Sequence, residues 1–330
     1  MIQKWRQLHP GGRRSIAGII VFVILYAGVV TFMSQGTDTS AADKTDNVLA
    51  SKMTQKRYDV YTQITSVDAL TGEATARIEP WPLDDTLGYR YRSGWMPLVD
   101  VNLHVDAIES KDNSGSNVFN FKSNVPTGGV NTTIDESSNS SAADISHYPF
   151  DKYKFEVPMS AEYIDAKKNV QNLPILPLDY TRSIDTFEIS MKHVLWTKSG
   201  EEVSADKDST ITDAIGEYNN GLTSSIFTAE RSSSTKLLTI IILFLMFTAF
   251  GSVAVMSYLI ASHKRPPSLI ALTWAAALTF SLIGLRSLFP GSPPIGIIID
   301  KVFYFPSLLA TLLCSLLILV EWSYREDFKI

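Results

Sequence analysis

Four long runs of apolar residues interrupt an otherwise mixed chain, one near its start and three in its last third. They cover residues 15–33, 237–261, 268–285 and 302–320, and each holds at least 18 residues without a charge. At 1.5 Å per residue, such a helix spans about 27 Å or more, close to the thickness of a bilayer's hydrocarbon core. The pattern predicts four transmembrane helices, one before and three after a large polar region.

The first run has a second interpretation, a cleaved signal peptide. Ser40, Ala41 and Ala42 supply small residues of the kind that precede a cleavage site. The run is long and ends well before them, which favours a retained helix. In both interpretations the residues that follow lie outside the cytoplasm.

Lysine and arginine are distributed unequally around the four runs. Eight of them fall in residues 1–14, 262–267 and 321–330, whereas the short segment 286–301 has only Arg286 and Lys301, at its ends. Basic residues accumulate on the cytoplasmic side of membrane helices. We therefore expect a multi-pass protein of the cell membrane, with its N-terminus, the turn 262–267 and its C-terminal tail in the cytoplasm.

The polar region divides into a linker, residues 34–52, and a domain, residues 53–235, in which apolar and polar residues alternate. The clearest alternation runs from Val99 to Ala107, and others cover residues 58–64, 74–78, 153–157 and 187–195. Period-two patterns separated by turns indicate an antiparallel β-sandwich or barrel. We also expect a short helix near residues 161–169 and a long polar surface loop over 109–145, with a short strand near 119–122.

Charge and cysteine content exclude several classes of protein. Residues 34–235 hold 18 basic and 30 acidic side chains, a net charge of 18 − 30 = −12, whereas the whole chain is at −5. A nucleic-acid partner is not expected, because phosphate binding needs a basic face. The single cysteine, Cys314, lies in an apolar run and forms no disulfide framework within one chain.

No pattern in the polar region singles out catalytic residues. Asp100, Asn102, His104 and Asp106 share one face of a predicted strand, and we interpret them as a solvated face rather than as metal ligands. The usual nucleophile, zinc-protease and phosphate-binding motifs are missing from the sequence. We expect no catalytic residues, no metal and no cofactor.

The sequence Tyr148-Pro149-Phe150-Asp151 predicts a structural corner ahead of a strand. Pro149 sets a turn, Phe150 is expected to fill the core, and Asp151 is expected to accept backbone N–H groups. A similar corner occurs in the extracellular domains of pentameric ligand-gated channels. Those channels have four spans after the β-domain and none before it, unlike this chain.

The segment between the last two runs, residues 286–301, combines charged and helix-breaking residues. We expect a kinked loop at the membrane surface, either closed by a pair between Arg286 and Asp300 or offering a binding surface to lipid or to a partner helix. The candidate binding residues are Arg286, Pro293, Pro294, Gly296 and Asp300.

These motifs resemble a family of polytopic membrane proteins described as a domain of unknown function, DUF4436. The resemblance rests on residues 274–280, on Leu285-Arg286 with the turn 290–296 and Asp300, on residues 148–153 and on Arg231. It implies an anchor helix, an exported β-domain and three further helices, and it implies no established activity.

Together these observations favour a non-enzymatic membrane protein whose exported β-domain binds an envelope protein, a glycan or a lipid, as a scaffold or accessory subunit. Two alternatives remain open. The chain is a subunit of a channel or transporter, or it is a membrane-anchored envelope enzyme.

Overall fold

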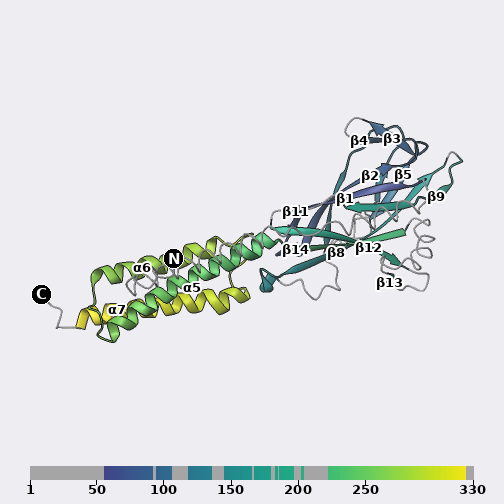
Figure 1. Ribbon diagram of the computed structural model, residues 1–330. Coiled ribbons are helices and arrows are strands. Elements are labelled where there is room, and N and C mark those ends of the chain that lie inside the picture. Colours follow the sequence, from purple (N-terminus) through teal and green to yellow (C-terminus); the bar gives the residue numbers. More distant parts are fainter. Residues whose placement is uncertain are drawn as a thin grey trace, which may run out of the picture.

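The computed structural model shows a β-rich domain and, at one end of it, three long helices that lie side by side (Figure 1). It describes residues 56–91, 94–105, 118–135, 145–165, 167–179, 183–184, 186–196, 202–203 and 222–324. The first apolar run, the N-terminal segment, the linker and the end of the C-terminal tail lie outside these residues.

Two sheets and one small hairpin form the β-domain. The four-stranded sheet has the order β10 (Ile175–Asp179), β1 (Tyr58–Asp68), β2 (Glu73–Pro82), β7 (Val130–Asp135). The larger sheet has the order β11 (Ser183–Ile184), β12 (Phe187–Trp196), β14 (Leu222–Arg231), β8 (Lys152–Ile164), β5 (Val101–Val105), β6 (Val118–Phe121), with β13 (Glu202–Val203) beside β12 and β9 (Val170–Asn172) beside β8. The hairpin pairs β3 (Gly88–Tyr91) with β4 (Gly94–Pro97).

Both sheets contribute to a single hydrophobic core. Alternate residues of β1 and β2 face alternate residues of β5, β8 and β14, so that side chains such as Val60, Ile78, Phe155 and Phe227 are fully buried in one cluster. Trp95 of the hairpin is also buried, with ring centroids 5.1 Å from Tyr58 and 5.4 Å from Phe121. This core supports the domain without disulfides.

The strands predicted by alternation are present. β5 lies within the predicted run 99–107, and β1 and β2 form the expected hairpin, with Gly72 at a φ of 73° in its turn. β8, β12 and β6 cover the other expected positions. Most of the pairings are antiparallel, but β1 pairs with β10 in parallel.

Two local expectations are wrong. No helix forms over 161–169 in the described residues there: β8 continues to Ile164, because it pairs with both β5 and β9, and a turn around Asp165 leads into β9. The predicted loop 109–145 contains β7, which pairs with β2 through residues 130–135. Tertiary pairing outweighs local propensity in both places.

Three helices follow the β-domain: α5 (Ser233–Ala261), α6 (Leu269–Ser287) and α7 (Phe305–Tyr324), the last preceded by the π-helical turn η2 (Asp300–Tyr304). Each of the three helical segments is long and apolar enough to cross a bilayer. Their apolar side chains are largely exposed, as expected of helices that face lipid. The β-domain is therefore followed by three candidate membrane spans.

Candidate functional site at the junction of the β-domain and the helices

A buried ion pair lies where the β-domain meets the helices. Arg231 is the last residue of β14, and Asp151 immediately precedes β8, the strand paired with β14. The Arg231 Nε lies 3.1 and 3.0 Å from the two carboxylate oxygens, and its Nη2 lies 3.0 Å from Oδ2. The side chains are 2% and 0% exposed, so the pair depends on this close geometry to offset the cost of burying two charges.

Other polar groups complete the coordination of this pair. Arg231 Nη1 donates to the Thr186 hydroxyl at 2.7 Å, and the Tyr153 hydroxyl donates to Asp151 at 3.0 Å. In the described part of the chain, Asp151 accepts from the Arg231 and Tyr153 side chains rather than from the expected backbone N–H groups. The aspartate therefore serves the junction between domains rather than only its own turn.

Tyr148 connects the corner directly to the helices. The Tyr148–Pro149 bond is cis, and the tyrosine side chain is 2% exposed. Its hydroxyl donates to the Pro290 carbonyl at 2.9 Å and lies 2.9 Å from Thr239 Oγ1, in the second turn of α5. Burial raises the pKa of Tyr148, so it remains a protonated donor near neutral pH.

The expectation that Phe150 fills the core is wrong. Phe150 is 63% exposed, and Tyr148 takes the buried position, packed in a cluster with Ile242 and Met246 of α5 and with Phe289, which follows α6. The Phe150 N–H donates to the His147 carbonyl at 2.9 Å, so both aromatic residues belong to one tight turn.

A series of cations and aromatic rings runs across the junction. Arg231 Cζ lies 4.1 Å from the Phe187 ring centroid and 5.1 Å from that of Tyr148. The ring centroids of Tyr148 and Phe289 are 6.1 Å apart. At the far end of the series, Arg286 Cζ lies 5.0 Å from the Phe289 ring centroid. Such contacts stabilise buried guanidinium groups. The two buried arginines are thus linked through two intervening rings.

The structure brings together all five residues proposed as a binding set in the loop between α6 and η2. Arg286 bonds both carboxylate oxygens of Asp300, and its Nη2 also donates to the carbonyls of Pro293 and Pro294, at 3.1 and 3.0 Å. The Gly296 N–H donates to Asp300 at 2.8 Å. These polar groups bond one another, an arrangement that favours a closed structural loop; a role in binding stays a prediction.

Gly291 allows this loop to approach the β-domain. Its φ is +72°, and a Cβ there would lie 2.8 Å from Arg231 Nη1 and 3.3 Å from Thr186 Oγ1. A larger residue would therefore meet the ion-pair network as well as an unfavourable backbone conformation.

The polar face of β5 is not a metal cluster in the part of the chain that the structure describes. Asp100 accepts the Ser123 N–H at 2.7 Å, and His104 lies 3.9 Å from Glu162. Within the described ranges no three His, Cys, Asp or Glu side chains gather as they would around a metal ion. Asp106, the fourth residue of that face, lies outside these ranges.

The sequence does not predict the roles of Thr186, Phe187 and Arg231 at the junction. A signal for Arg231 is present, because Phe227, Ala229 and Arg231 alternate, which places the arginine on the buried face of its strand. A buried arginine requires a carboxylate partner. The partner, 80 residues earlier, has no local signal.

The junction and the helices define a membrane-anchored β-domain protein. Residues 48–206 match the family model "Domain of unknown function (DUF4436)", the family that the sequence motifs resemble. Residues 231–325 match a second family model, "Domain of unknown function (DUF8686)". No curated protein matches the chain.

The two matches divide the junction between them. Asp151 and Tyr148 lie in the first match, whereas Arg231, Thr239 and Pro290 lie in the second. Most of the motifs on which the DUF4436 resemblance rested, from residue 274 to Asp300, fall in the second match. The ion pair and the Tyr148 contacts therefore join two separately recognised domains.

Proposed function

We propose that this chain is a non-enzymatic membrane protein that displays a sandwich-like β-domain for binding an envelope protein, a glycan or a lipid. The supporting observation is an apolar surface at the end of the β-domain farthest from the helices. We define this surface, the distal tip, by Leu83, Tyr89, Leu98 and Val125, all of them exposed. Exposed apolar clusters of this kind mark interaction surfaces on folded domains.

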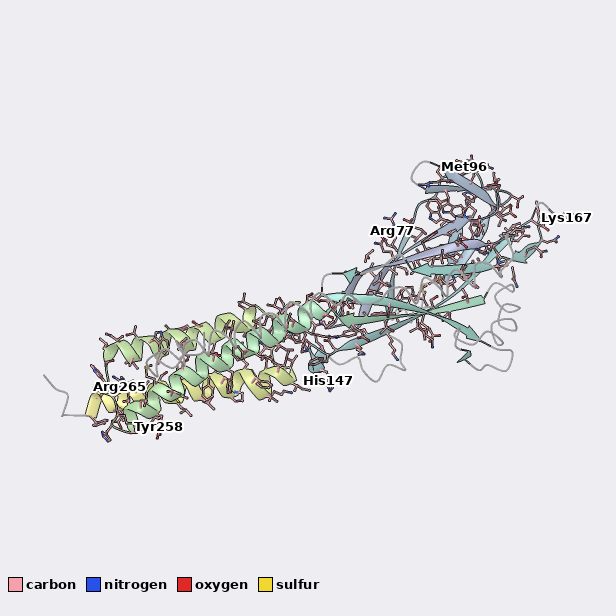
Figure 2. All side chains as sticks on the ribbon, viewed as in Figure 1. Arg77, Met96, His147, Lys167, Tyr258 and Arg265 are labelled. Atoms are coloured by element: carbon pink, nitrogen blue, oxygen red, sulfur yellow. The ribbon has the colours of Figure 1, made fainter. Side chains whose placement is uncertain are left out.

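The distal tip is built on and beside the β3–β4 hairpin. Tyr89 pairs with Met96 across the hairpin, and Met96 lies far from the helices (Figure 2). Leu98 directly follows the hairpin, and the Asn124 N–H donates to Pro97, which places Val125 beside it. Buried Trp95 anchors the hairpin in the core, so the exposed side chains are held on a rigid support.

The junction supports a role in display. β14 ends at Arg231 and α5 begins at Ser233, with Ser232 as the N-cap that accepts the Thr235 N–H at 3.2 Å. A connection of one residue, together with the Arg231–Asp151 pair, holds the β-domain at a fixed angle to the helices. A partner bound at the tip is thereby kept at a set distance from the bilayer.

The orientation that we propose follows from the basic residues of the sequence. The N-terminus, the 262–267 turn and the C-terminus lie in the cytoplasm, residues 15–33 form a fourth helix, and the β-domain is extracytoplasmic. Lys154 and Lys192 are exposed and serve as reporters. A membrane-impermeant amine reagent should label them in intact cells. Labelling only after lysis would contradict this orientation and place the β-domain in the cytoplasm.

The binding proposal is tested by affinity purification of the full chain from native membranes in several mild detergents, with mass spectrometry of co-purified protein, glycan and lipid. Leu98→Glu and Val125→Glu should abolish recovery of the partner. Thr65→Glu, an equal charge at an exposed position of β1, should leave it unchanged. Recovery of the protein alone in every detergent would argue against the proposal.

A subunit of a channel or transporter is a second candidate, favoured by the same junction. The series Phe187–Arg231–Tyr148–Phe289 connects the β-domain core to the helices, so a change in one domain has a direct route to the other. This candidate is tested by comparing ion flux in proteoliposomes that hold the unsubstituted protein with flux in proteoliposomes that hold the Arg231→Met variant. Equal background flux for both proteins would reject this candidate.

A further inference from the structure

The two most exposed large apolar side chains of the described β-domain lie at its helix-facing end, away from the distal tip. Leu70, in the β1–β2 turn, is 69% exposed, and Phe150, in the corner before β8, is 63% exposed. Neither belongs to the hydrophobic core. Side chains of this size, left bare beside a set of membrane helices, call for an apolar environment.

Hydrogen bonds place both residues next to the junction. The Tyr153 hydroxyl lies 3.2 Å from the Ala69 carbonyl and 3.0 Å from Asp151, so the β1–β2 turn adjoins the buried ion pair. Phe150 lies between Asp151 and the Tyr148 corner. His147, at the start of this corner, lies beside the ends of the helices (Figure 2).

The length of α6 indicates where the junction lies relative to a bilayer. α6 has 19 residues and is therefore about 28 Å long, just enough to cross the hydrocarbon core, so its end at Ser287 marks one boundary of that core. Leu282 and Phe289, which flank this end, share a cluster with Ile242 and Tyr148. The tyrosine hydroxyl beside Thr239 consequently lies at the hydrocarbon boundary.

Exposed apolar residues of the helical domain continue at the same level. Leu288 is 62% exposed and Ile295 is 78% exposed, both in the loop between α6 and η2. Below them, the helices present apolar side chains to the surroundings over their whole length. Leu70 and Phe150 therefore extend, from two loops of the β-domain, an apolar surface that already faces lipid.

We propose that Leu70, Phe150, Leu288 and Ile295 form a lipid-contacting rim that inserts into the acyl-chain boundary of the leaflet nearest the β-domain. The partner is the surrounding bilayer, because the rim is continuous with the lipid-facing helices. The rim fixes the β-domain against the membrane surface at two points beside the ion pair. This inference goes beyond display of the distal tip and does not depend on it.

Spin labelling tests the rim in the full chain, reconstituted in nanodiscs of phosphatidylcholine and phosphatidylglycerol. In a Cys314→Ser background, single cysteines replace Leu70 or Phe150 and carry a nitroxide. Leu83→Cys and Val125→Cys, two exposed apolar positions at the distal tip, are the matched controls. Power saturation with oxygen and with a water-soluble nickel chelate reports the depth of each label.

Labels at residues 70 and 150 should be more accessible to oxygen than to nickel, with the ratio inverted at residues 83 and 125. Phe244→Cys and Phe280→Cys, at exposed positions within α5 and α6, provide the lipid reference, and labels at 288 and 295 should behave like those at 70 and 150. Nickel accessibility at 70 and 150 equal to that of the controls would overturn the proposal. Protection from both reagents would also overturn it, because protein, such as residues 15–33 or a second copy, would then cover the rim. Partner recovery at the distal tip is a separate measurement and is unaffected by either result.

Discussion

Replacing Arg231 by methionine removes the charge of the junction and keeps most of the side-chain length. The Arg231 and Asp151 side chains are 2% and 0% exposed. Of the two side chains described as donors to the Asp151 carboxylate, the substitution leaves the Tyr153 hydroxyl. Breaking a buried ion pair on one side costs about 3–5 kcal/mol. In a domain of this size, each kcal/mol of lost stability lowers the melting temperature by about 2–4 °C, so we expect a fall of about 6–20 °C.

The assay is thermal unfolding of the full chain in nanodiscs, followed by intrinsic fluorescence, to which the buried Trp95 contributes. Lys152→Met is the control. It breaks the neighbouring pair between Lys152 and Glu230, 2.7 Å apart, whose side chains are 50% and 38% exposed. Solvent screens such a pair, so its loss should cost about 1 kcal/mol or less and shift the melting temperature by about 4 °C or less.

A double-mutant cycle with Asp151→Asn isolates the interaction. The double variant should be less destabilised than the sum of the single variants, by about 0.5–3 kcal/mol, because removing both charges leaves neither one buried alone. Strict additivity would refute the reasoning. So would an Arg231→Met shift no larger than that of Lys152→Met.

Three further substitutions test other contacts by the same melting assay. Gly291→Ala should lower stability by about 1–3 kcal/mol, since φ is +72° and the added Cβ would meet Arg231; an unchanged melting temperature would contradict the close approach. Tyr148→Phe should cost about 1–3 kcal/mol because the Pro290 carbonyl loses its donor, and a melting temperature equal to that of the unsubstituted protein would count against it. Thr62→Val should stabilise by about 1 kcal/mol, because the buried Thr62 hydroxyl has no hydrogen-bond partner in the described part of the chain; a loss of stability would indicate a bound water.

The sequence predicts strands well where one face of a strand is apolar. β5 alternates between buried Val101, Leu103 and Val105 and polar neighbours, so its period is visible. β14 was missed because its buried face begins with Thr223 and Ser225, which are polar. At this end of β14, burial of the polar residues depends on partners from other strands, and no apolar alternation reports it.

The candidate site is predictable only in its local parts. The pairing of Arg286 with Asp300 follows from two charges at the ends of neighbouring spans, 14 residues apart. The bonds from Tyr148 to Thr239 and Pro290 join residues 91 and 142 positions apart. Which aromatic residue of the corner turns inward is decided by these distant contacts, so the sequence favoured Phe150 and the structure buries Tyr148.

The ion pair at the junction limits how the two domains can be exchanged between proteins. A chimera that takes residues 48–206 from this chain, and its membrane part from an unrelated one, would inherit the carboxylate of Asp151 without its guanidinium. Such a graft should fold only if position 231 in the recipient is also made arginine and a small residue is kept opposite it, where Gly291 lies. Domain swaps that use this chain therefore need to carry three separated positions together.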